Sequence, residues 1–152
     1  MESITDGITK RRAELLARLA AERSHLLLHL EGADVRRLES DPVSGELTAT
    51  ALLAHLAYWE ALSADRLGKL AAGQESEIRP IGDGAVDRLN ADLKAMFVGL
   101  GFDESLAMLQ KERRNFLMAL GQTSHELLRR RIRFPDGRLI TARHWATQPH
   151  RH

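Results

Sequence analysis

The sequence predicts an all-α protein, a four-helix bundle formed by one domain over residues 1–152. Its long segments repeat apolar residues at steps of three and four, which is the spacing of one helix face. The chain is rich in Leu, Ala, Arg and Glu, which are good helix formers, and it contains only four Pro. Clusters of Gly, Pro and Asp interrupt the periodic segments, so the pattern divides the chain into four main helices.

The first helix is expected from Thr5 or Asp6, either of which can cap its free N–H groups, to about Leu30. Gly32 provides the stop that commonly follows a helix. Residues 33–47 contain Asp-Pro and a Gly and are expected to form a loop.

The second helix is expected from its cap at Thr48 to about Ala72. Charges, Pro and Gly fill residues 74–84, a connection long enough to carry the chain to the other end of the bundle. The third helix is expected in two pieces, residues 85–98 and a second piece capped by Asp103, because two Gly lie between them.

A short hairpin or extended arm is expected before the last helix. Alternating residues flank a Pro-Asp-Gly turn at 135–137, which is a typical hairpin signal. Thr141 is the expected cap of a last helix that carries Trp145. Pro149 disfavours helical geometry at the residue before it, so the sequence predicts a short last helix.

The composition excludes several functions. With 22 basic and 21 acidic residues the net charge is +1, which gives no reason to expect nucleic acid or a membrane as a partner. The chain has no Cys, which rules out disulfides, thiolate ligands and a cysteine nucleophile within it. It shows no apolar leader and no run of 18 apolar residues, so we expect a soluble protein of the cytoplasm.

One histidine lies inside an apolar stripe. Leu52, Leu56, Trp59 and Leu62 recur at helical spacing in the second helix, and His55 falls within their stripe. A histidine in such a place is either a packed side chain with one hydrogen-bond partner or a ligand that points into the bundle. Taken alone, the stripe favours the packed side chain.

The last helix makes a metal site the competing interpretation. His144, Gln148 and His152 are each four residues apart and share one face if the helix continues past the proline, whereas His150 lies off that face. A histidine on one buried helix and two ligands at i and i+4 on another, here His55 with this face, are a common way to build a metal site in a bundle. Such a metal generates a nucleophilic water near neutral pH or activates a thiolate from a cosubstrate.

Two charged residues lie in or beside the apolar stripes. Glu60 is either a carboxylate that orients an imidazole or, in the interpretation we favour, a surface charge. Arg113 interrupts the stripe of the third helix and either reaches the interior or, as we favour, extends its charged end to water.

Three segments together resemble the DinB/YfiT-like superfamily of four-helix-bundle metalloenzymes: residues 52–60, the Phe-Pro-Asp-Gly-Arg turn at 134–138 and the histidine-bearing last helix. The family pattern has one His on the second helix and a His-x-x-x-His pair on the last. In that register the resemblance implies His55 as the first metal ligand, Gln148 at the second position and His152 as the third.

The chain departs from the family pattern at the second ligand position. The amide oxygen of Gln148 is a weaker ligand than an imidazole for zinc or nickel, and Pro149 perturbs the helix beside it. His144 and His150 are the alternate ligands.

The resemblance implies a divalent-metal-dependent enzyme, with Zn, Ni or Fe as the metal. The expected activity is that of a thiol-dependent transferase or a hydrolase that acts on a small reactive molecule, with a low-molecular-weight thiol as a cosubstrate. The resemblance also implies a homodimer. The alternative, motivated by Gln148, is a non-catalytic and metal-free bundle that binds a small ligand or forms a homodimer.

Overall fold

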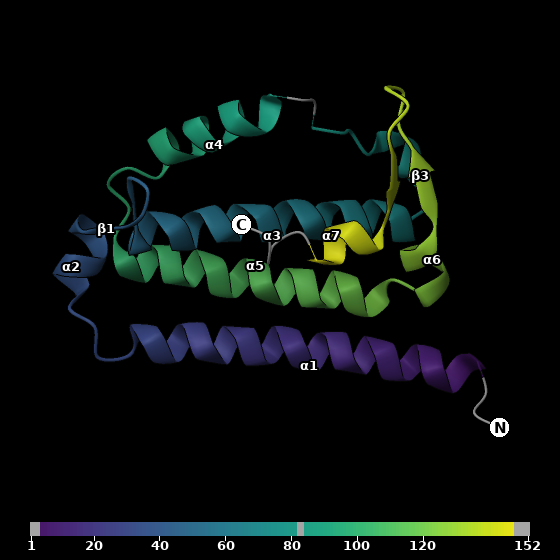
Figure 1. Ribbon diagram of the computed structural model, residues 1–152, viewed down its shortest axis with the longest axis horizontal. Helices are drawn as coiled ribbons and strands as arrows, with labels where there is room; N and C mark the ends of the chain where they lie inside the picture. The colour runs from purple at the N-terminus through teal and green to yellow at the C-terminus, as the bar shows by residue number, and fades with distance from the viewer. Residues whose placement is uncertain (1–3, 82–83, 148–152) are drawn as a thin grey trace. The chain divides into compact units, whose positions relative to one another are not determined.

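The protein is mostly helical. The computed structural model describes residues 4–81 and 84–147, and these ranges contain seven α-helices and two small two-stranded sheets (Figure 1). The helices are α1 (Ile4–Leu30), α2 (Val35–Ser40), α3 (Ala49–Ala71), α4 (Ala85–Met96), α5 (Phe102–Gln122), α6 (His125–Arg129) and α7 (Arg143–Thr147), with a 3₁₀ turn η1 (Glu75–Glu77). The strands are β1 (Pro42–Ser44), β2 (Leu47–Thr48), β3 (Arg131–Arg133) and β4 (Leu139–Thr141). The predicted all-α class is confirmed, whereas the four-helix bundle stays a prediction.

Two compact units make up the chain, Met1–Val35 and Arg36–His152. In its described part the first unit contains α1, which ends at Leu30 as predicted. Thr5 and Asp6 lie inside α1, which begins at Ile4, so the prediction that one of them caps the helix is wrong. Helices α3 to α7 and both sheets belong to the second unit. That one domain spans the whole chain stays a prediction.

The second unit is built on α3 and α5, which pack against each other and run in the same direction (Figure 1). Thr48 caps α3 as predicted, since its hydroxyl oxygen accepts a hydrogen bond from the N–H of Ala51 at 3.1 Å. Glu60 and Arg113 each lie eleven residues after the first residue of their helix, and they form an ion pair. In two parallel helices that start at the same end, residues equally far from the first residue lie side by side. The Glu60–Arg113 pair is therefore consistent with a parallel arrangement.

Parallel neighbours need a crossover, and residues 72–101 provide it. This connection returns the chain from the end of α3 to the start of α5 and contains η1 and α4 (Figure 1). Leu93 of α4 and Phe97 just after it pack with Ala54 of α3 in one buried apolar cluster. The crossover therefore contributes to the core of the second unit.

Residues 33–47 are more structured than the loop that the sequence predicts. They contain α2 and most of the antiparallel hairpin β1–β2.

A carboxylate oxygen of Glu39 accepts a hydrogen bond from the N–H of Phe102 at 2.9 Å, 63 residues along the chain. Asp103 lies in the first turn of α5 and is not its cap, so that prediction is wrong. A carboxylate from another element satisfies the helix start and complements the helix dipole, which a local pattern cannot reveal.

The hairpin expected before the last helix is present. Strands β3 and β4 pair antiparallel, with Arg131 opposite Thr141. The N–H of Gly137 donates to the carbonyl of Phe134 at 2.9 Å, and Gly137 adopts a φ of +86°, which favours glycine. Thr141 is wrong as the cap of the last helix, because it lies in β4 and α7 begins at Arg143.

Candidate functional site

His55 is a core side chain of α3 that is 9% exposed. The indole N–H of Trp59 donates a hydrogen bond to Nε2 of His55 at 3.1 Å, and the two rings meet edge to face. Residues four apart share a helix face, so the spacing of this pair produces the contact. A metal that used Nε2 of His55 would have to displace the indole N–H.

The other predicted metal ligands either lie outside the described residues or line a pocket that does not include His55. Gln148, His150 and His152 lie outside the described residues. His144 is half-buried in α7 and lines a pocket that does not include His55. Within residues 4–81 and 84–147 no group of three or more His, Cys, Asp or Glu is arranged to hold a metal ion. Of the three predicted ligands, His55 is the one that lies in the described part of the chain, and of the two alternates His144 lies there.

Glu60 and Arg113 form a buried ion pair between α3 and α5. Glu60 is 1% exposed and Arg113 is 9% exposed, so both favoured interpretations, a surface charge and an arginine that reaches water, are wrong. Each charge is tolerated in the interior because the other neutralises it. The pair joins the middle of one helix to the middle of the other.

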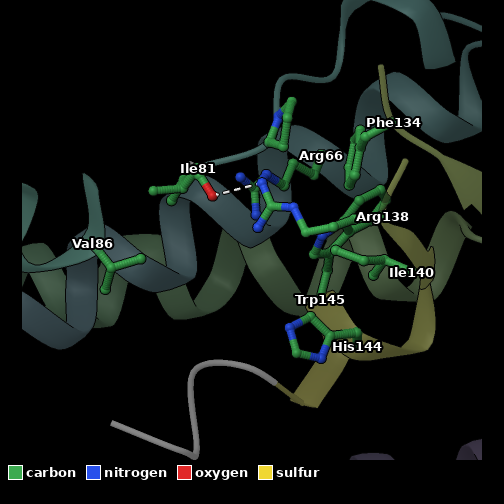
Figure 2. Close-up of a pocket in the computed structure, with 9 residues that line it drawn as sticks. Arg66, Ile81, Val86, Phe134, Arg138, Ile140, His144 and Trp145 are labelled. Atoms are coloured by element: carbon green, nitrogen blue, oxygen red, sulfur yellow. Dashed lines mark hydrogen bonds between the residues drawn. The ribbon is translucent and has the colours of Figure 1, made fainter. Parts of the chain in front are cut away.

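A second polar region lies beside the C-terminal half of α3, where a pocket of about 170 Å³ opens (Figure 2). Its walls come from α3, from the segment around α4, from the β3–β4 hairpin and from α7. Its polar lining residues are Arg66, Arg138 and His144. Its apolar lining residues are Pro80, Ile81, Val86, Phe134, Ile140 and Trp145.

Arg66 is the most deeply buried charge at this pocket, with 7% of its surface exposed. Its Nη2 donates to the backbone carbonyl of Arg79 at 3.2 Å, and its guanidinium carbon lies 5.7 Å from the ring centre of Trp145. The pKa of Arg66 is lowered, chiefly because burial removes water from the guanidinium. The nearby charge of Arg138 also lowers this pKa, whereas that of Asp65 raises it.

Arg138 lies at the same pocket and is held by the hairpin turn. Its Nη2 donates to the carbonyl of Ile81 at 2.9 Å (Figure 2), and its Nε lies 2.7 Å from a carboxylate oxygen of Asp136. The pKa of Asp136 is lowered by a hydrogen bond from the backbone N–H of Arg138 and then by the Arg138 side chain. The Asp-Gly-Arg turn therefore fixes one guanidinium beside another.

Sequence reasoning did not select Arg66 as a site residue, although a signal was present. Arg66 lies four residues after Leu62, so it continues the apolar stripe that contains Trp59. A charge in that stripe is a candidate functional residue on the same grounds as His55. Arg138 was part of the turn at 134–138 but had no assigned role.

Comparison of the chain with family models, with curated proteins and with solved structures finds no match. The resemblance to the DinB/YfiT-like superfamily therefore stays a prediction. None of the helices in the described ranges has both the length and the apolar content that crossing a bilayer requires.

Proposed function

We propose that the chain is a DinB-like four-helix bundle and a divalent-metal-dependent enzyme, a thiol-dependent transferase or a hydrolase that acts on a small reactive molecule. The observation that supports this proposal is the burial of His55 on α3, the helix against which both α5 and α7 pack. A divalent metal bound there supplies a Lewis acid that lowers the pKa of a bound water or thiol.

The position of α7 limits which residues can accompany His55. Trp145 of α7 lies over Arg66, which follows His55 by eleven residues, or about 16 Å along a helix. His144 is next to Trp145 and lines the pocket with two arginines, whose charges repel a cation. Further ligands must therefore come from beyond the described part of α7, where Gln148 and His152 belong in the sequence.

A second candidate function is a metal-free bundle that binds a small ligand. The hydrogen bond from Trp59 to Nε2 of His55 favours it, because this bond already satisfies one of the two ring nitrogens through which an imidazole binds a metal. In this alternative His55 is a packed core residue and the pocket beside Arg66 is the place where a ligand binds.

The metal content of the purified protein distinguishes the two candidates. We expect about one Zn²⁺, Ni²⁺ or Fe²⁺ per chain by mass spectrometry, and loss of that metal in His55→Ala. His25→Ala is the matched control, because His25 is exposed on α1. Zn²⁺ should also raise the unfolding temperature of the wild type and of the control but not of His55→Ala, because a ligand selective for the folded state stabilises it. Equal metal content in all three proteins, or none after incubation with each ion, would contradict the metal-dependent proposal.

A further inference from the structure

The pocket beside Arg66 has an unbalanced charge. The charged side chains that line it within the described residues are the guanidiniums of Arg66 and Arg138, and no carboxylate lines it there. Asp136, an acid of the hairpin turn, binds the Nε of Arg138. Asp65, the acid beside Arg66 in the sequence, forms its ion pair with Lys69 at 2.8 Å. The described residues that line the pocket therefore place a positive charge at Arg66, and no carboxylate among them neutralises it.

Arg66 has neutral partners where a buried arginine ordinarily has an anionic one. A carbonyl oxygen and an indole ring stabilise a guanidinium but leave its charge in place. Within the described part of the chain, no carboxylate forms an ion pair with Arg66. Buried charges in proteins are normally paired, because removal of an ion from water is unfavourable. The cavity beside Arg66 is a place where an anion can reach the guanidinium.

The apolar lining residues and the volume of the pocket indicate the polarity and the size of the ligand. Six apolar residues line the pocket together with the two guanidiniums, and the aromatic rings of Phe134 and Trp145 are among them (Figure 2). Its volume of about 170 Å³ is smaller than the roughly 300–1,000 Å³ of pockets that bind drug-sized ligands. That space fits a small organic acid and is too small for a drug-sized ligand.

We propose that this pocket binds the carboxylate of a small organic acid with a compact apolar body. Arg66 supplies the principal charge and Arg138 the second one, because guanidinium forks match carboxylates in geometry. The apolar body lies against Phe134, Ile140 and Trp145. This site is separate from His55 and is occupied without a metal.

Calorimetric titration of the EDTA-treated protein tests this proposal, with benzoate as the probe. Benzamide is the neutral control ligand of similar shape, and inorganic phosphate is an anion without an apolar body. We expect saturable binding of one benzoate per chain, with benzamide and phosphate each at least tenfold weaker. Equal binding of benzoate and benzamide would overturn the role of charge, and so would the absence of saturable benzoate binding by the folded wild type. Phosphate binding as tight as that of benzoate would overturn the assignment of an organic acid.

Variants locate the bound benzoate. Arg66→Gln and Arg138→Gln should each weaken benzoate binding at least tenfold, whereas Arg114→Gln, at an exposed position of α5, should change it less than twofold. Ile140→Trp should abolish binding, because it fills the pocket and leaves both charges in place. If Arg66→Gln does not fold, Arg138→Gln and Ile140→Trp decide whether benzoate binds in this pocket. Unchanged affinity in folded variants, or an equal loss in Arg114→Gln, would place benzoate elsewhere.

Discussion

Arg113 and Arg66 are both buried in the second unit, and their surroundings differ. Arg113 of α5 meets the carboxylate of Glu60, which is itself buried. Arg66 of α3 meets a backbone carbonyl and an indole ring, and in the described ranges no carboxylate pairs with it. A cavity lies beside Arg66, where an anion can enter.

The difference separates a structural charge from one that is available to a ligand. Glu60 and Arg113 neutralise each other's charge within the fold, so the effect of this pair is to fix the register of α3 against α5. Arg66 is held in place by neutral partners while its charge stays uncancelled, which is the state that a binding residue needs before its ligand arrives. The role of a buried charged side chain therefore follows from the groups that contact it and not from its burial alone.

The largest expected effect comes from breaking the Glu60–Arg113 ion pair. Glu60→Gln leaves Arg113 buried without its counterion, and we expect the free energy of unfolding to fall by about 3–5 kcal/mol. Urea denaturation monitored by circular dichroism measures this loss. The double variant Glu60→Leu, Arg113→Met should recover most of it, because an apolar pair needs no neutralisation. Single and double variants of equal stability would show that the two charges are not coupled.

The main helices and their breaks follow from local patterns. The Leu stripes, the Thr48 cap and the Gly residues near position 100 predict α1, α3, α4 and α5, because each depends on neighbours within a few turns. The short elements α2 and α6 and the β1–β2 hairpin escape this reasoning, since they are too short to show a period. For α2, the bond from Phe102 to Glu39 joins it to α5, and no local window contains that contact.

The polar partners were harder to predict than the helices. The position of Glu60 beside the stripe was visible in the sequence, but its burial depends on Arg113, which lies 53 positions away. Only the parallel register of α3 and α5 brings the two together. Arg66 and Arg138 likewise meet through tertiary structure, because one is on a helix and the other follows a hairpin turn. By contrast, the contact of His55 with Trp59 is local, and a core histidine with one partner was among the predicted interpretations.

A smaller expected effect follows from removal of the charge of Arg66. Arg66→Met keeps the aliphatic stem and removes both the unpaired charge and its bonds to neutral partners, so we expect a change of about 1 kcal/mol or less in the free energy of unfolding. Benzoate at 100 times its dissociation constant should stabilise the wild type by about 2.7 kcal/mol and leave Arg66→Met unchanged. Urea denaturation with and without benzoate measures both values. A loss as large as that in Glu60→Gln would mean that Arg66, like Arg113, is neutralised by a counterion within the fold.

The smallest expected effect concerns Asp65, the acid that acts on Arg66 through space while it binds Lys69. Asp65→Asn breaks an exposed pair between residues four apart, so we expect a loss below about 0.5 kcal/mol in urea denaturation. Calorimetry should show benzoate affinity that is equal to that of the wild type or up to about twofold tighter, since a carboxylate that competes weakly for the same charge is gone. If Asp65→Asn instead destabilises the protein as strongly as Glu60→Gln, then Asp65 is the counterion of Arg66. The two buried arginines would then be alike, and the cavity would lose the charge on which anion binding depends.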